Sequence, residues 1–195
     1  MRLLRAAARY PCSKGEIPDL AKGVVESWGI SLSTLSDNYF ATIHQWLPIL
    51  DKETFCGRIR SRAEPEFDDS FAALVLAVHL LTQLPCKCGQ HTTDTLLYRA
   101  TRRLFMLTYT ETEEPQRLDI LQAGLLISVY ECGHGLAQRA YATLGCCLTL
   151  SRMMSLDCES SLDGEQSDTH PISRACWAII LLDRYVDQVL LAGCS

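Results

Sequence analysis

A proline between two helical patterns, in residues 39–55, constrains the fold of this chain more than any other feature. The apolar positions before it form two adjoining helical stripes, Tyr39, Ile43 and Trp46 on one and Phe40, His44 and Leu47 on the other. Pro48 disfavours helical geometry at the preceding residue, so the first helix is predicted to end near Trp46. Asp51 can accept hydrogen bonds from the first amides of a second helix, which carries Phe55 and Ile59. The segment therefore predicts a helical hairpin.

Helical patterns also account for most of the remaining sequence. Residues 1–17 are expected to form a flexible leader, and the folded domain is expected over 18–195. No run of alternating apolar and polar residues indicates a strand. We predict an all-α fold, an antiparallel bundle of about seven to eight helices with short connections. The expected helices cover residues 18–28, 34–46, 52–62, 67–84, 93–110, 116–132, 135–154 and 171–191.

Two segments suggest how this bundle is arranged. The stretch from Phe71 to Leu84 is apolar nearly all round, which predicts a central helix. Leu156–His170 contains five acidic and no basic residues, with serine and glycine between them, and is predicted to be a surface loop. Gly29, Gly89 and Gly133–Gly135 are expected at helix ends or tight turns.

Composition excludes several classes of protein. The formal net charge is −5, so the chain carries no overall positive field for nucleic acid. The longest apolar runs are too short to cross a bilayer. The ten cysteines come without a secretory signal, which favours a reducing compartment and free thiols over a disulfide framework. Residues 1–9 resemble a mitochondrial presequence in composition, but we favour an exposed, frayed start or a fragment of an interdomain linker.

Two cysteine–histidine arrangements are candidates for chemistry. Cys86, Cys88 and His91 offer ligands that suit zinc, but a fourth ligand is not evident, and Pro85 and Gly89 already explain an interhelical loop. Cys132 and His134 invite a thiol-catalysis hypothesis. Sequence proximity does not supply the required geometry, so we favour a helix end followed by a glycine-rich turn.

The remaining candidates are interpreted as structural. His44 is expected to hydrogen-bond a backbone carbonyl and lock the turn before Pro48, with a sensing role as the alternative. Asp183 and Arg184 are expected to form an ion pair or a cap inside the bundle. An effector pocket, if the domain has one, is expected between the helices that carry the aromatic residues. These aromatic residues are predicted to lie in the core: Tyr39, Phe40, Trp46, Phe55, Tyr130, Tyr141 and Trp177.

Four segments, in this order, resemble the fungal-specific transcription factor domain, which is the regulatory or middle homology region of zinc-cluster transcription factors. They are Tyr39–Phe55, Leu121–Gly135, Ala140–Cys146 with Leu148, Leu150, Ser151 and Arg152, and Trp177–Val186. Together they cover roughly residues 36–187. The resemblance implies a structural role for the following positions: Tyr39, Phe40, His44, Trp46, Pro48, Asp51, Phe55, Gln122, Tyr130, Gly133, Gly135, Tyr141, Gly145, Trp177, Asp183 and Arg184.

The resemblance also implies a function. It predicts transcription regulation in the nucleus, with the cytoplasm or mitochondrion as alternatives, through protein partners, a small-molecule effector or intramolecular contacts. The family's zinc cluster needs six cysteines built around two Cys-x-x-Cys pairs, and this chain contains no such pair. We therefore expect no zinc, no catalytic site and no direct nucleic-acid contact here; zinc is expected only in the zinc-cluster module. The alternatives are a stand-alone helical interaction module and, less favoured, a Cys/His or zinc-dependent enzyme.

The chain departs from the family pattern at its C-terminal end. Cys176 stands where the first of two tryptophans is expected, and the usual basic run is reduced to Arg174. The family domain continues beyond Asp183 and Arg184, so we expect an incomplete domain with an uncovered apolar face near 175–192. Self-association or marginal stability is the expected consequence.

Overall fold

The computed structural model describes residues 21, 23–24, 29, 31–61, 68–83, 95–111, 117–160 and 171–192. The predicted all-α fold is confirmed, since the described residues contain helices and no strand. The predicted leader at 1–17 lies outside the described residues. The elements are α3 (Leu32–Ala41), the 3-10 turn η1 (Ile43–Gln45), α4 (Lys52–Ser61), α5 (Asp69–Thr82), α6 (Leu96–Glu111), α7 (Arg117–Gly133), α8 (Ala137–Ser160) and α9 (Pro171–Ala192).

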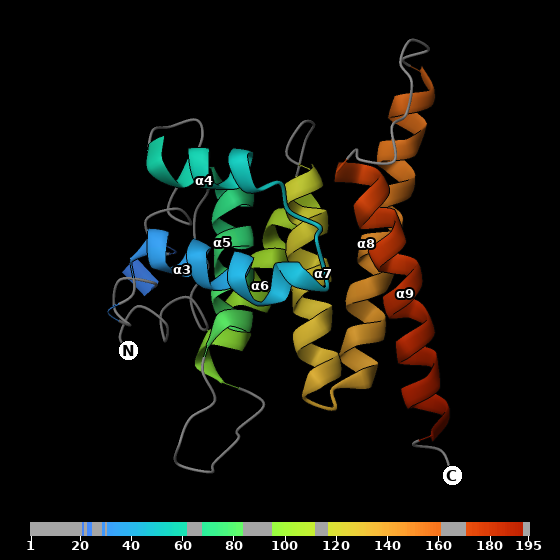
Figure 1. The fold of residues 1–195 in the computed structure, drawn as a ribbon. Coiled ribbons are helices and arrows are strands. Elements are labelled where there is room, and N and C mark those ends of the chain that lie inside the picture. The colour runs from blue at the N-terminus through green and yellow to red at the C-terminus, as the bar shows by residue number, and fades with distance from the viewer. Residues whose placement is uncertain are drawn as a thin grey trace.

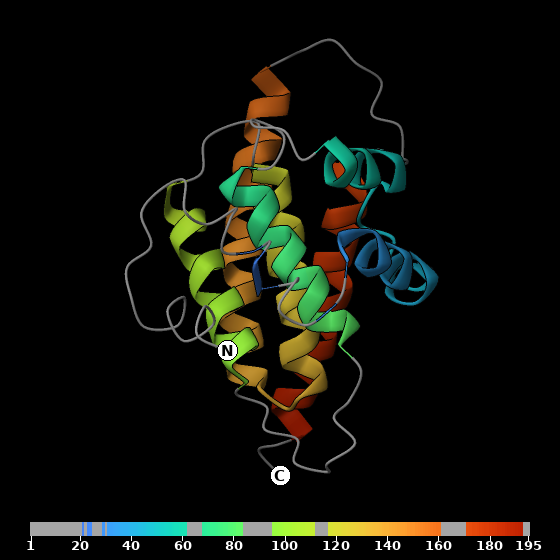
Figure 2. The same ribbon diagram turned by 90° about the vertical axis from the view of Figure 1, so that its left-hand side faces the viewer.

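Helices α7, α8 and α9 lie side by side in an up-and-down arrangement (Figure 1). Helix α7 also packs on α5 and α6, so it is covered on several sides. The short helices α3 and α4 lie on one side of α5, and α6 lies on the other (Figure 2). Helix α9 contacts α7 and α8 and forms an edge of the bundle. No helix of the described residues is long and apolar enough to cross a membrane.

The helix starts follow local sequence signals. The side chain of Asp51 accepts a hydrogen bond from the Thr54 amide at 2.9 Å, which confirms its predicted role at the start of α4. Asp68 accepts from the Phe71 amide at 2.8 Å in the same way. Gly135, between α7 and α8, has a φ of 71°, a left-handed conformation that favours glycine. The predicted turn at Gly133–Gly135 is therefore confirmed.

Helix α5 is the central helix that its composition predicted. Every residue from Ser70 to Leu80 is buried, because α3, α6 and α7 all pack on it. Tyr39, Phe40, Phe55 and Tyr130 are also buried, as predicted. Edge-to-face contacts join Phe40, Phe55 and Phe71, whose successive ring centroids lie 6.0 and 5.4 Å apart. This aromatic column ties α3 and α4 to α5.

Three aromatic residues predicted in the core are exposed instead. Trp46 is 57 % exposed, Tyr141 56 % and Trp177 64 %. Trp46 follows the 3-10 turn η1, where the chain no longer has α-helical geometry. Its ring therefore does not lie on the buried face that a continuous α-helix would have given it. Tyr141 and Trp177 lie on the faces of α8 and α9 that no described helix covers. The prediction failed because a helical stripe shows which residues share a face, not which faces a neighbour covers.

Other expectations also need correction. The helix predicted over 34–46 ends as an α-helix at Ala41 and continues only as the 3-10 turn η1. Helix α8 continues to Ser160, so the loop predicted from Leu156 is helical in its first part, and residues 161–170 lie outside the described residues. Asp183 and Arg184 are exposed in the middle of α9, and among the described residues they form neither a cap nor an ion pair inside the bundle.

Candidate functional site

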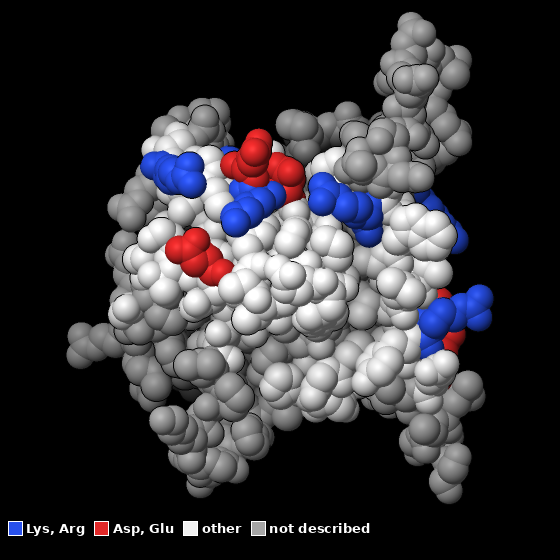
Figure 3. All heavy atoms as spheres, viewed as in Figure 1, with Lys and Arg blue, Asp and Glu red and all other residues white. Residues whose placement is uncertain are grey.

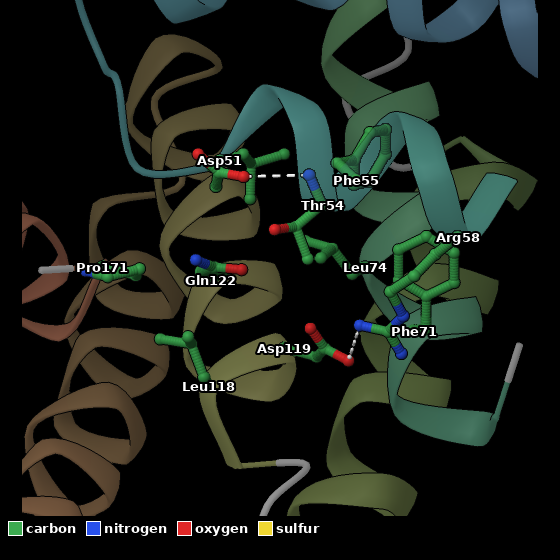
Figure 4. Close-up of a pocket in the computed structure, with 11 residues that line it drawn as sticks. Asp51, Thr54, Phe55, Arg58, Phe71, Leu74, Leu118, Asp119, Gln122 and Pro171 are labelled. Carbon is green, nitrogen blue, oxygen red and sulfur yellow. Dashed lines mark hydrogen bonds and ion pairs between the residues drawn. The ribbon is translucent and has the colours of Figure 1, made fainter. Parts of the chain in front are cut away.

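A small hollow lies where α4, α5, α7 and the first residue of α9 meet (Figure 4). Its volume is about 80 Å³. Ligand pockets commonly measure about 300–1,000 Å³, so only a small group fits here. The walls are Leu50, Asp51, Thr54, Phe55, Arg58, Phe71, Leu74, Leu118, Asp119, Gln122 and Pro171. Of the aromatic motif residues, only Phe55 lines it.

An ion pair closes one side of the hollow. Nη1 of Arg58 donates to Oδ2 of Asp119 at 2.7 Å, which joins α4 to α7. The Arg58 guanidinium also stacks on the Phe71 ring, 3.9 Å from its centroid, and lies 3.9 Å from Asp68. Burial raises the pKa of Asp119, and the charge of Arg58 offsets part of that rise.

Gln122 and Asp51 form the opposite wall. Nε2 of Gln122 donates to the carbonyl oxygen of Ile49 at 2.8 Å, so α7 holds the segment that follows Pro48. The hydrogen bond from the Thr54 amide lowers the pKa of the Asp51 carboxyl, which stays ionised at neutral pH. The hollow is therefore polar on two sides. No local signal along the chain indicates the pairing of Arg58 with Asp119, because these residues lie 61 positions apart.

A second polar cluster joins α6, α7 and α8. Oε1 of the fully buried Glu131 accepts from the Tyr98 hydroxyl at 2.6 Å, and Oε2 accepts from Thr143 Oγ1 at 2.8 Å. Nε of Arg102 lies 3.3 Å from Oε1. Burial raises the pKa of Glu131, and it raises that of Tyr98 to about 12. These contacts satisfy both oxygens of the carboxylate, so we interpret the cluster as structural.

Cys132 lies in the last turn of α7, and His134 directly follows that helix. Burial raises the pKa of Cys132 to about 11, so the thiol is protonated at neutral pH. Nδ1 of His134 lies 2.8 Å from the carbonyl oxygen of Tyr130, and its ring stacks on Tyr130 with centroids 3.9 Å apart. The favoured interpretation, a helix end with a tight turn, agrees with this arrangement.

His44 does not lock the turn as predicted. Its Nδ1 has no hydrogen-bond partner among the described residues, and its ring packs edge-on against Phe40 at 4.9 Å. Burial, followed by the charges of Arg174 and Lys52, lowers its pKa. The less favoured candidate zinc ligands, Cys86, Cys88 and His91, lie outside the described residues. Within the described ranges, no group of three metal-binding side chains gathers.

An exposed apolar stripe runs along α9. It consists of Trp177, Ile180, Leu181 and Tyr185, which we call the α9 stripe. These residues are spaced by three and four positions, so they share one face of the helix. Ala175, Ala178, Ile179 and Val186 form the opposite, buried face. In Figure 3, charged side chains gather along the upper rim, at one place on the left and along the right edge, where α9 lies, and the middle of that face shows none.

Comparison with known proteins identifies the family. Residues 36–187 match the model of the fungal specific transcription factor domain. The chain is 31 % identical over 110 residues to Transcription factor BOA15 of Botryotinia fuckeliana (strain B05.10), a match that covers 56 % of this chain and 59 % of that protein. The chain thus matches little more than half of the relative's length. No solved structure matches it. The chain therefore belongs to the fungal specific transcription factor domain family.

Proposed function

We propose that this chain regulates transcription in the nucleus through protein contacts made by the α9 stripe, and that it neither reads DNA nor catalyses a reaction. Its net charge of −5 supplies no overall positive field for phosphates. The thiol of the half-buried Cys132, whose pKa is raised to about 11, argues against cysteine catalysis. We place zinc and base recognition in a zinc-cluster module outside this sequence. The α9 stripe is the observation that supports a contact-based mechanism.

The stripe is unusual in the size and exposure of its residues. Trp177 is 64 % exposed and Leu181 66 %. Large exposed apolar patches mark contact surfaces more often than scattered single residues do. Burying one such side chain contributes roughly 1.5–3 kcal/mol. Covering this face therefore provides a driving force for association.

The occupant we propose is a second copy of this chain. In an antiparallel pair of α9 helices centred on Leu181, the Trp177 of each copy lies opposite Tyr185 of the other, since both are four residues from the centre. The two central leucines then meet each other. A stable interface commonly buries about 1,600 Å² in total, and one helix face supplies less. We therefore expect weak pairing that depends on protein concentration. Weak pairing allows a shift between monomer and dimer populations.

Sedimentation equilibrium over a range of concentrations tests this proposal. We expect the wild type to shift from monomer to dimer and Leu181→Asp to remain monomeric. Met106→Asp, at an exposed apolar position on α6 away from the stripe, is the control and should dimerise like the wild type. A monomeric wild type, or equal loss in both variants, would refute pairing through α9.

A reporter assay connects this contact with regulation. The chain is fused to a heterologous DNA-binding module, and Leu181→Asp should change reporter output while Met106→Asp does not. A fluorescent fusion should accumulate in the nucleus, and the purified chain should not retard DNA. Retardation of DNA by the chain alone would contradict the proposal that only a separate zinc-cluster module reads DNA.

As the alternative, the chain is a stand-alone helical interaction module. Its α9 stripe then binds a full-length family member. If the chain does not pair with itself, the exposed α9 stripe is free to bind such a partner and supports this alternative. Mixing the monomeric chain with a purified full-length relative distinguishes the two. A mixed complex that Leu181→Asp abolishes would support the alternative.

A further inference from the structure

One charged residue, Arg184, lies within the α9 stripe. It follows Ile180 by four positions and Leu181 by three, so a helix of 3.6 residues per turn places it on the same exposed face. The exposed residues Trp177, Leu181, Arg184 and Gln188 are spaced by four, three and four positions. This is the spacing of the seam along which two helices meet in a coiled coil. Arg184 is therefore a cation in the seam of an otherwise apolar contact face.

The other charged residues of α9 lie outside this seam. Asp183 is two positions from Leu181, about 200° round the helix, and Asp187 follows Leu181 by six positions and flanks the stripe. Arg174 lies in the first turn of α9, before the stripe, and is half-buried. Among the described residues, Arg184 forms no ion pair. Its guanidinium is thus available to a partner.

No helix of the described chain covers the seam. Helix α9 contacts α7 and α8 through its buried face and forms an edge of the bundle (Figure 1). Any group that binds Arg184 along the stripe therefore comes from a partner. What that partner must offer depends on how its own charges lie against the guanidinium.

A second copy of the chain meets this requirement poorly. In the antiparallel pair centred on Leu181, each Arg184 is level with Ala178 of the other copy, since both are three positions from the centre. Asp183 and Asp187 of the other copy lie five and nine positions further along, about 7.5 and 13.5 Å at 1.5 Å per residue. Self-pairing thus removes water from two guanidiniums and brings no carboxylate to the level of either. A polar residue in such a seam restricts the choice of partner at a cost in stability.

We propose that Arg184 makes the α9 stripe selective for a partner helix that carries a carboxylate in its own apolar seam. This inference rests on the proposed function, because it names the partner that the same stripe prefers. A second copy is then a weak partner, and an apolar helix with an acidic seam residue is a stronger one. The apolar residues supply most of the affinity, and the charge of Arg184 decides between partners.

The chain itself provides the probe. Arg184→Glu keeps the apolar stripe and places a carboxylate in the seam, and the exposed position leaves the core unchanged. Fluorescently labelled wild type at trace concentration is titrated with unlabelled wild type or with Arg184→Glu, and anisotropy reports binding. We expect the mixed pair to be about five- to tenfold tighter than the wild-type pair or the Arg184→Glu pair at low salt. The preference should shrink as salt screens the charges.

Two further variants separate the seam from overall charge. Arg152→Glu makes the same change in net charge at an exposed position on α8, and it should bind labelled wild type as tightly as the wild type does. Arg184→Gln removes the cation without supplying a carboxylate. It should pair with itself more tightly than the wild type does, because no guanidinium loses water.

The outcomes distinguish this inference from the proposed function. Equal affinities of the mixed and like pairs would overturn the role of Arg184 and leave the α9 contact standing. No binding in any combination would overturn both. Binding of the mixed pair alone would support the selectivity even if the wild type stays monomeric. A gain with Arg152→Glu equal to that with Arg184→Glu would mean that overall charge chooses the partner, and would overturn the inference.

Discussion

Gln122 of α7 donates its side-chain amide to the carbonyl oxygen of Ile49, 73 positions away in the sequence, at 2.8 Å. Two motif segments that looked independent along the chain are thus joined by one buried hydrogen bond. Ile49 lies between η1 and α4, outside both helices, so its carbonyl has no helical partner and takes a donor from elsewhere.

Replacing Gln122 by methionine should destabilise the fold. The change keeps the side-chain volume but leaves the buried Ile49 carbonyl without a donor. We expect the free energy of unfolding in urea to fall by about 1–3 kcal/mol. Gln138→Met, at an exposed position on α8, should change it by less than about 0.5 kcal/mol. Equal stability of the two variants would mean that this bond contributes nothing.

Glu131→Gln should weaken the contact among α6, α7 and α8. Glutamine accepts at only one end, so it cannot accept from both the Tyr98 hydroxyl and Thr143, and Arg102 loses its charged partner. We expect a loss of about 1–3 kcal/mol in chemical denaturation. Glu53→Gln, an exposed acid in the first turn of α4, serves as the control and should be nearly neutral. A neutral Glu131→Gln would show that the carboxylate is dispensable.

Gly124→Ala should be costly because three helices meet at that position. An added Cβ would lie 2.5 Å from Cys147 Sγ and 2.9 Å from Cε2 of Phe105. We expect a loss of about 1–3 kcal/mol from overpacking. The double variant Gly124→Ala/Cys147→Ala should recover part of it, since the sulfur is then absent. Thermal melts of the two variants would reveal the difference.

Gly145→Ala provides the matched comparison on α8. A Cβ there meets nothing within 4 Å, and the position is helical and exposed. Alanine should therefore stabilise the fold by about 0.5–1 kcal/mol. A loss of stability at this position would indicate a contact absent from the described structure.

Acid should destabilise the fold through His79. Burial lowers the pKa of this fully buried histidine to about 4, well below the 6.5 of an unfolded chain. Between these values only the unfolded state binds the proton, so stability falls as the pH drops from 6.5 towards 4. At pH 5 the expected loss from this group is about 2 kcal/mol.

His79→Leu isolates that effect. Glu131 and Asp119 have raised pKa values and act in the opposite direction, because their folded state binds the proton more readily. The difference in unfolding free energy between wild type and His79→Leu removes their contribution. That difference should change by about 2 kcal/mol between pH 7 and 5, and a constant difference would contradict the prediction.

Local signals in the sequence predicted the helices and many of their ends. Asp51 was correctly placed at the start of α4, Gly133–Gly135 at the turn after α7, and the all-round apolar stretch at the centre of the bundle. These features depend on a few neighbouring residues, so they can be read along the chain. The end of α8 was missed because its acidic, serine-rich residues favour loops only weakly.

The sequence by itself determined the helical class, the family and the residues that share each helical face. Tertiary structure alone decided which faces are covered. It exposed Trp46, Tyr141 and Trp177, and it brought Arg58 to Asp119 and Gln122 to Ile49. Helical periodicity and capping are local properties, whereas burial and long-range pairing depend on which helices pack together. The hollow between α4 and α7 therefore emerges only from the folded chain.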